Sequence, residues 1–212
     1  MTLQGRIFIA RHGETVFNAA AKMQGQKNMH TPLTRTGFAQ ADAMGAGLAA
    51  WLGTRQTLSL WSSSAGRALQ TLAVIAEHIE ADYHAISADP RLEEIDVGDW
   101  SGLSYEEIGR THKDFLDRER GLFTMRPPRG EFYDDIAVRL RAWIDDTKHE
   151  RGDRLIVMHG ISSRVLRGIL LGLPDDPQFG APIADGLPQG TMVMIGGGVE
   201  KIIHQGLGVS HA

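Results

Sequence analysis

The chain of 212 residues contains no cysteine, so it can form neither a disulfide nor a thiolate metal site. Positive charge is also limited, because 26 acidic residues outnumber 22 Lys and Arg and leave a formal net charge of -4 at pH 7. This balance argues against a nucleic-acid or membrane partner. Apolar runs are too short to span a bilayer, and residues 1–6 lack the apolar core of a signal peptide. We therefore expect a cytoplasmic protein.

Hydrophobic residues make up 42% of the chain, which suits one globular domain with a sizeable core. The sequence shows neither an internal repeat nor an interdomain linker. The stretch 125–130 contains Pro and Gly, and we interpret it as part of an irregular insert at about 87–130 that folds over the active site. Residues 1–212 are therefore predicted to form a single domain.

Apolar segments typical of buried strands alternate along the chain with segments of helical periodicity. Strands are expected at residues 7–10, 59–62, 83–86 and 155–158, and at 192–195 and 199–203 as a hairpin joined by three glycines. Helices are expected at residues 36–52, 66–81, 104–110, 113–120, 133–150 and 162–171. The helical residues expected to face the core are Ile136, Leu140, Trp143, Ile144 and Thr147. This alternation predicts a three-layer α/β/α fold around a mostly parallel sheet.

The most informative segment is Arg-His-Gly-Glu-Thr at residues 11–15, which directly follows the apolar residues 7–10. Open α/β sheets bind ligands at the carboxyl ends of their strands, where this segment should lie. The guanidinium of Arg11 discourages protonation of the imidazole and so keeps His12 a neutral nucleophile. Arg11 can also hold a phosphate by two parallel hydrogen bonds. The pair indicates phosphoryl chemistry through a phosphohistidine, although an isolated Arg-His pair more often only opens a surface turn.

Two other apolar segments end in the same kind of side chain. Residues 155–158 lead directly into His159, and residues 60–63 lead to Arg67 at the start of a predicted helix. Backbone N–H groups and the helix dipole also favour an anion at such a helix start. Three predicted strands thus deliver a cation or an imidazole to one edge of the sheet, which favours a phosphate site over a surface turn.

Together these fragments resemble the histidine phosphatase superfamily, also called the phosphoglycerate mutase-like family, in its small phosphatase branch. The resemblance covers nearly the whole chain and implies a single histidine phosphatase domain with the phosphoglycerate mutase-like fold. The matching fragments are residues 11–15, Asn18, Gln24-Gly25, Pro32-Leu33-Thr34, Ser62-Ser63, Arg67-Ala68, Thr71, Leu92, Glu94, Gly98-Asp99-Trp100, Gly102, Met158-His159-Gly160 and residues 170–174.

The resemblance also implies residue roles. His12 is expected to accept the phosphoryl group, and Glu94 to give a proton to the leaving group. The phosphate-binding residues implied are Arg11, Asn18, Arg67 and His159. Weaker substrate contacts are expected from Thr15, Gln24, Gly25 and Gly160. Glu93 is also acidic, but its neighbour Glu94 has the family's spacing to Gly98, so we interpret Glu93 as a solvated carboxylate.

These roles imply a phosphomonoesterase that needs neither metal nor cofactor and acts on a small phosphate ester. Positioned cations stabilise the transferring phosphoryl group, and one carboxyl serves both half-reactions. A mutase of the phosphoglycerate type would transfer the group to a retained acid, but such family members are typically longer. A metal hydrolase would need closely spaced His and carboxylate residues, and the nine His residues of the sequence form no such motif. A non-catalytic phosphoprotein-binding module would more plausibly lack His12 or Glu94.

The sequence departs from the family pattern in two places. Six residues, 26–31, separate Gly25 from the Pro-Leu-Thr motif without the usual aromatic residue, and we expect this loop to reshape the substrate site. His30 in that loop is interpreted as a surface residue. Phe132 stands where the family usually has Ser, and the nearby Arg126 and Arg129 are interpreted as solvated rather than substrate-binding. The substrate and the oligomeric state are left open by the sequence.

Overall fold

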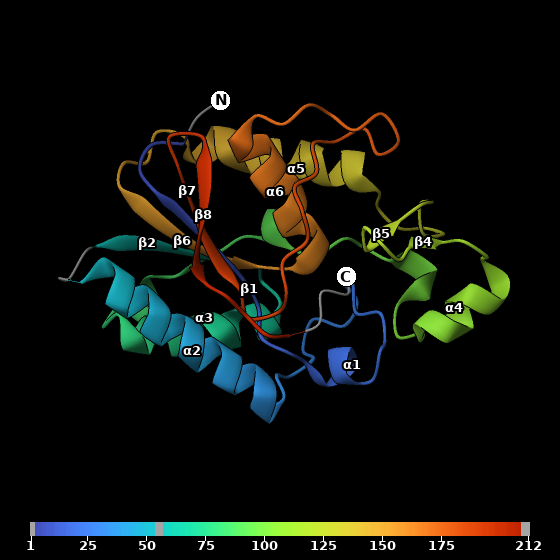
Figure 1. Ribbon diagram of the computed structural model, residues 1–212, viewed down its shortest axis with the longest axis horizontal. Helices are drawn as coiled ribbons and strands as arrows, with labels where there is room; N and C mark the ends of the chain where they lie inside the picture. The colour runs from blue at the N-terminus through green and yellow to red at the C-terminus, as the bar shows by residue number, and fades with distance from the viewer. Residues whose placement is uncertain (1–2, 54–56, 209–212) are drawn as a thin grey trace.

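The computed structural model describes residues 3–53 and 57–208; the first two residues of the N-terminal segment discussed above lie outside them. A six-stranded sheet with the order β3-β2-β6-β1-β7-β8 forms its centre (Figure 1). The first four strands in this order are parallel, whereas β7 and β8 run antiparallel to their neighbours. The strands are β1 (Ile7–Arg11), β2 (Leu58–Ser62), β3 (Ser87–Ala88), β6 (Asp153–Met158), β7 (Met192–Gly196) and β8 (Val199–His204). The predicted mostly parallel sheet is confirmed.

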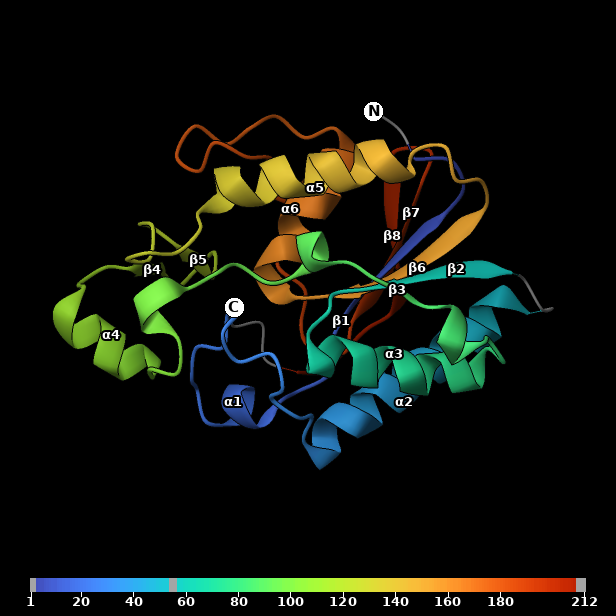
Figure 2. The ribbon, with the colours of Figure 1, turned by 180° about the vertical axis from the view of Figure 1, so that it is seen from behind.

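Helices cover both faces of this sheet, which confirms the predicted three layers. Figures 1 and 2 show α2 (Arg35–Leu52) and α3 (Gly66–His78) on one face, and α5 (Tyr133–Thr147) and α6 (Gly160–Leu171) on the other. Side chains of β1 alternate between the two layers: Ile9 packs into the α5/α6 core cluster, and Phe8 packs into the α2/α3 cluster. Among the described residues, no helix combines the length and the apolar character needed to cross a membrane.

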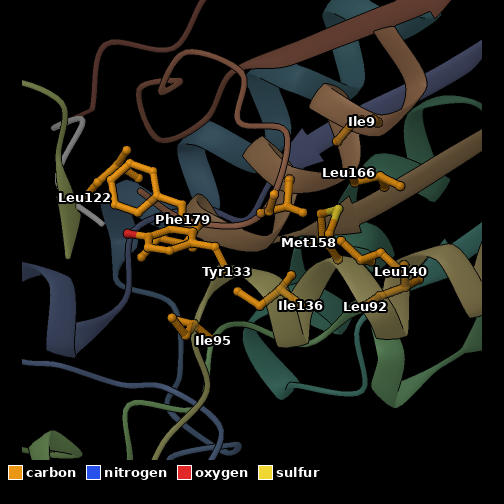
Figure 3. Packing of buried hydrophobic residues seen from close by; sticks show 14 of the residues in the cluster. Ile9, Leu92, Ile95, Leu122, Tyr133, Ile136, Leu140, Met158, Leu166 and Phe179 are labelled. Carbon is orange, nitrogen blue, oxygen red and sulfur yellow. The ribbon is translucent and has the colours of Figure 1, made fainter. Parts of the chain in front are cut away.

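The α5/α6 core is built from the residues that the helical spacing predicted. Ile136, Leu140, Trp143, Ile144 and Thr147 are all buried on α5. Figure 3 shows two of them beside Met158 of β6, and it also shows residues of the 87–130 segment in the same cluster. The segment 87–130 therefore shares the core of the sheet.

The segment 87–130 is irregular, as expected. Its helix α4 lies at the same end of the molecule as α1 (Val16–Ala19) (Figures 1 and 2). Its short elements are the 3-10 turns Pro90–Leu92 and Gly98–Trp100, the helix α4 (Tyr105–Thr111), and the strands β4 (Leu116–Asp117) and β5 (Leu122–Phe123). The predicted helix over 104–110 is thus confirmed within one residue, with Ser104 as its N-cap.

Two local predictions are wrong. Residues 113–120 form no helix: β4 and β5 pair as an antiparallel hairpin, because Asp117 accepts the N–H groups of Glu119 and Arg120 at 3.0 Å and turns the chain. Residues 83–86 form no strand either. The Asp82 carboxylate caps a 3-10 turn over Tyr83–Ala85, and the strand β3 begins only at residue 87.

The register of the parallel strands places their carboxyl ends at one edge. Arg11 is the partner of Met158, and Ser62 is the partner of Val157. The backbone N–H of His12, just beyond β1, donates to the carbonyl of Met158 at 3.0 Å. The segments that follow β1, β2 and β6 therefore begin at the same edge of the sheet, as the positions of their functional residues predicted.

A close backbone approach fixes the segment after β1 against the start of α2. A Cβ placed on Gly37 would lie 2.0 Å from the carbonyl oxygen of Glu14, and one placed on Gly13 would lie 2.3 Å from the carbonyl oxygen of Gly37. Backbone atoms on both sides leave no flexible side chain that could move away. Only glycine permits this packing.

We therefore expect Gly37→Ala to destabilise the protein by about 1–3 kcal/mol, as overpacking does elsewhere. The control is Gly109→Ala in α4, where a Cβ would meet only Phe115 at an ordinary 3.8 Å. There, the better helix propensity of alanine should stabilise by about 0.5–1 kcal/mol. Urea unfolding of the two variants measures both effects, and equal stabilities would contradict the close packing of Gly37.

Candidate active site

His12 follows β1 directly and is buried, with 4% of its surface exposed. Its Nδ1 lies 2.7 Å from the carbonyl oxygen of Gly13. Because a carbonyl only accepts hydrogen bonds, this contact requires the proton on Nδ1 and leaves a lone pair on Nε2. The local backbone thus selects the tautomer that a nucleophile needs.

Two buried guanidinium groups flank this imidazole. Arg11 is 4% exposed and donates through Nη1 to the carbonyl oxygen of Leu187 at 2.9 Å. Arg67, in the first turn of α3, is 1% exposed and donates to the carbonyl oxygens of Gly25 at 3.2 Å and Asn28 at 3.3 Å. Backbone carbonyls satisfy part of the hydrogen-bonding capacity of both cations while leaving their positive charge in the site.

Burial and positive charge keep the site's imidazoles neutral. The pKa of His12 lies well below its usual value, because burial disfavours the charged form and the Arg67 and Arg11 cations repel it. The cations respond to burial as well. Burial lowers the pKa of Arg67 to about 10 and also lowers the pKa of Arg11, and in both cases Glu94 acts in the opposite direction. A pKa of about 10 leaves Arg67 charged near pH 7, and a guanidinium such as that of Arg11 stays protonated in proteins.

His159, the N-cap of α6, packs against His12 with ring centroids 5.1 Å apart. Arg67 donates through Nε to its Nδ1 at 3.2 Å, so the proton sits on Nε2, which lies 2.7 Å from the Ser63 hydroxyl. Burial and Arg67 hold the pKa of His159 well below its usual value, so the ring adds no positive charge. The structure brings His159 to the site, but with both ring nitrogens engaged; its contact with phosphate stays a prediction.

Glu94 reaches the site from the segment 93–97. Its Oε1 accepts the N–H of Ser162 at 2.9 Å, and its Oε2 accepts the N–H of Ile161 at 3.1 Å. The N-terminus of α6, which follows β6 at the same sheet edge, therefore fixes the carboxyl group in place. Glu94 lines the same cavity as His12.

Glu93 points elsewhere, as the extended backbone predicts for neighbours. Its carboxylate accepts a hydrogen bond from the Ser64 hydroxyl, and the residue is not among those that line the cavity with His12 and Glu94. It is half-buried, so the expectation of a freely solvated carboxylate is only partly correct.

Asn18 and Thr15 form a capping pair at the start of α1. The Asn18 Oδ1 accepts from the backbone N–H of Thr15 at 3.0 Å and from its hydroxyl at 2.8 Å. This arrangement directs the amide of Asn18, which lines the cavity, while Thr15 is fully buried. Thr15 therefore positions Asn18, and these hydrogen bonds explain why Thr15 is buried here. Its contact with substrate stays a prediction.

The other predicted contacts lie at the cavity wall. Gln24, Gly25 and Gly160 all line it. A Cβ on Gly25, which has φ +56, would lie 2.6 Å from Val97, and a Cβ on Gly160 would lie 3.3 Å from the Arg11 guanidinium. Glycine lets Val97 approach residue 25 and the Arg11 guanidinium approach residue 160 closely.

This cavity is small, about 30 Å³, and shares the lining residues Asn18 and Lys22 with a much larger cavity of about 830 Å³. The larger cavity is walled mainly by α4 and the segment 113–121, with Tyr105, Phe115 and Leu116 as its apolar lining. It also carries three acidic and three basic side chains, Glu14, Glu106, Asp114, Lys22, Lys113 and Arg118.

Sequence reasoning missed this larger cavity and the partners that orient the site. Ser63 and Thr71 were quoted as family fragments, yet their tasks were not foreseen: Ser63 pairs with His159, and Thr71 accepts the N–H of Gly13 at 3.1 Å. Lys22 had no signal of its own, because a lone lysine in a polar segment is usually solvated.

The residues that depart from the family pattern, all of which the structure describes, line neither cavity. The loop 26–31 nevertheless contacts two residues that do, because Gln26 donates to the carbonyl oxygen of Glu94 and the carbonyl oxygen of Asn28 accepts from Arg67. The expected effect of this loop on the substrate site stays a prediction. His30 is exposed, as predicted. Arg126 and Arg129 pair with surface aspartates. Where Phe132 replaces Ser, its own N–H is accepted by Asp135 at 2.8 Å.

Within residues 3–53 and 57–208, no three His, Asp or Glu side chains gather where they could hold a metal ion.

Comparison with known sequences places this geometry in a family. A family model described as histidine phosphatase superfamily (branch 1) matches residues 7–184. A probable phosphoglycerate mutase, GpmB, of Photorhabdus laumondii is 34% identical over 80% of this chain and 76% of its own length. A glucosyl-3-phosphoglycerate phosphatase of Mycolicibacterium vanbaalenii is 30% identical over 91% of this chain and 84% of its own length.

Solved structures agree with the sequence relatives. A mycobacterial glucosyl-3-phosphoglycerate phosphatase, in complex with VO3, superposes with a TM-score of 0.73 and 27% identity. The match covers 93% of this chain and 97% of that one. Because both the family model and the fold extend over most of the chain, the protein belongs to the histidine phosphatase superfamily, branch 1.

Proposed function

We propose that the protein is a metal-independent phosphomonoesterase that works through a phosphohistidine at His12. The observation that carries this proposal is the buried neutral imidazole of His12, beside the cations Arg11 and Arg67, in a cavity that Glu94 also lines. Phosphoryl transfer spreads negative charge over three equatorial oxygens, so fixed cations beside a neutral nucleophile are the groups it needs. The vanadate complex of a related phosphatase supports an oxyanion in the corresponding fold.

In the first half-reaction, the Nε2 lone pair of His12 attacks phosphorus, and the bond from phosphorus to the ester oxygen breaks. Glu94 in its protonated form gives a proton to the departing oxygen. Arg11 and Arg67 stabilise the equatorial oxygens, and the amide of Asn18 adds a neutral contact.

In the second half-reaction, water attacks the phosphorus of the phosphohistidine, and the bond from nitrogen to phosphorus breaks. Glu94, now a carboxylate, takes the proton from that water. Inorganic phosphate leaves, and His12 returns to its neutral form. One carboxyl thus serves both steps.

A mutase of the phosphoglycerate type would differ only in the acceptor, because a hydroxyl of the retained substrate would replace water. The similarity to GpmB favours this second candidate. The larger cavity favours hydrolysis, since it gives a leaving group somewhere to go and water a way in. A non-catalytic binding module would hold phosphate without forming the intermediate.

The larger cavity also indicates the substrate class. Its volume of about 830 Å³ and its lining by Tyr105, Phe115 and Leu116 suit a bulky, partly apolar leaving group. Its three acidic and three basic side chains provide polar contacts without a net charge. We propose a phosphate ester of such an alcohol, larger than a three-carbon acid, as the substrate.

Rapid quenching with 32P-labelled ester tests the intermediate. Wild-type protein in excess chelator should give label that is acid-labile and base-stable, followed by inorganic phosphate, and His12→Ala should abolish both. Label that moves to an alcohol rather than to water would identify the mutase. Binding of phosphate without any covalent label would identify the binding module, and activity that requires metal would contradict the proposal.

Substrate size tests the leaving-group site. We expect Leu116→Ala to lower kcat/KM about tenfold for a bulky apolar ester, which is the usual value of a few methylene contacts. The same variant should leave a short ester such as phosphoglycerate nearly unaffected. Leu173→Ala, at an exposed leucine outside the cavity, is the matched control. Equal losses for both esters would contradict the assignment of this cavity.

The neutral histidines predict how stability depends on pH. The pKa of His12 is lowered in the folded state, so below about pH 6.5 the unfolded chain binds a proton that the folded chain does not. The free energy of unfolding should therefore fall with decreasing pH, by up to about 1.4 kcal/mol per pH unit for this group. His12→Gln should remove that part of the slope between pH 6.5 and 5 in urea unfolding. His30→Gln, at an exposed histidine, is the control, and identical slopes in all three proteins would contradict a buried neutral His12.

A further inference from the structure

The segment that carries Glu94 is held by a partly buried charged network that lies outside the cavity with His12. Glu131 and Arg139 form an ion pair at 3.0 Å whose side chains are only 22% and 14% exposed. Glu131 comes just before α5 and Arg139 lies within it, so the pair stands on a rigid element. Neither residue lines the cavity with His12.

This network binds the Glu94 segment at successive backbone groups. Arg139 donates to the carbonyl oxygens of Arg91 at 2.6 Å and Glu94 at 3.3 Å. The Glu131 carboxylate accepts the N–H of Asp96 at 3.0 Å, and the Glu131 N–H donates to the carbonyl of Asp96 at 2.8 Å. The backbone is thus fixed on both sides of Glu94 and at Glu94 itself.

The loop 26–31 supplies a third member. Gln26 donates through Nε2 both to the carbonyl oxygen of Glu94 at 3.0 Å and to the Glu131 carboxylate at 3.2 Å. Two side-chain donors from separate elements therefore meet on one backbone oxygen, that of Glu94. One of these two donors, Gln26, belongs to the loop 26–31 that departs from the family pattern.

We propose that Glu131, Arg139 and Gln26 are positioning residues that hold the Glu94 carboxyl for proton transfer. The Glu94 side chain is anchored on α6 through its oxygens, and its backbone is anchored on α5 through this network. The distance between α5 and α6 then sets where the proton is delivered. A shift of about 1 Å at such a group costs on the order of a hundredfold in rate. The inference rests on the proposed function, because it concerns the acid of that reaction.

The test measures single-turnover phosphorylation with an alkyl phosphate and with p-nitrophenyl phosphate. An alkoxide needs the proton when it leaves, whereas nitrophenolate leaves nearly unaided. Glu131→Gln keeps the side-chain shape but removes the charge that holds Arg139. We expect it to slow the alkyl ester at least about tenfold more than the aryl ester. A purely structural role would slow both esters alike.

Three further variants make the result specific. Glu200→Gln breaks the ion pair between Arg167 of α6 and Glu200 of β8, whose side chains are 2% and 23% exposed. This variant should lower the Tm without changing the ratio of the two ester rates. Glu131→Gln placed in a Glu94→Gln background should cause no additional change in that ratio. Gln26→Met removes the hydrogen bonds to the Glu94 carbonyl oxygen and to the Glu131 carboxylate but keeps both charges of the ion pair. It should show the same selectivity to a smaller degree even where Glu131→Gln does not fold.

The outcomes separate the two proposals. If the wild type forms the phosphohistidine but Glu131→Gln or Gln26→Met slows both esters equally, the positioning role is overturned and the proposed function stands. If Glu131→Gln still changes the ratio of ester rates in the Glu94→Gln background, the network acts on some group other than Glu94, and the inference fails. If the wild type forms no phosphoenzyme, both proposals fall.

Discussion

The burial of two guanidinium groups beside a neutral imidazole is the constraint on which the rest of this structure depends. Removing a cation from water is expensive unless hydrogen bonds and opposite charge compensate. Arg11 and Arg67 donate to the backbone carbonyl oxygens of Leu187, Gly25 and Asn28. Glu94 provides opposite charge nearby. The compensation leaves both cations charged and the imidazole of His12 neutral. Such a pocket favours an incoming dianion more than it favours water.

The parallel sheet makes this arrangement possible. Register pairs Arg11 with Met158 and Ser62 with Val157, so the segments after β1, β2 and β6 start from one edge. The main chain just beyond two of these strands orients side chains of the site. The Gly13 carbonyl selects the tautomer of His12, and the first N–H groups of α6 hold Glu94. The reacting groups are therefore placed largely by main-chain atoms, which vary little with sequence.

Much of this was accessible from sequence, because periodicity and strand ends are local signals. The core face of α5 and the convergence of Arg11, Arg67 and His159 on one edge were predicted. The features that the sequence did not predict depend on contacts between distant segments or on the chemistry of a turn. Asp117 turned a predicted helix into a hairpin, and the full pairing of His159 by Ser63 and Arg67 depends on contacts between distant segments. No local sequence pattern predicts that Gln26 and Arg139 both donate to the carbonyl oxygen of Glu94.

Under the proposed function, the residues for the chemistry and those for substrate choice come from different segments, which the departures from the family pattern alone do not reveal. The loop 26–31 contacts Arg67 through Asn28 and the Glu94 segment through Gln26, but it lines neither cavity. The wall of the larger cavity comes mainly from α4 and the hairpin that follows it. In the proposed reaction, we therefore expect changes in the loop to act on the reacting groups, and changes in α4 and the hairpin to act on the leaving group. Because α4 and the hairpin belong to the insert rather than to the central sheet, the proposed leaving-group site can vary without disturbing the main-chain contacts that position His12.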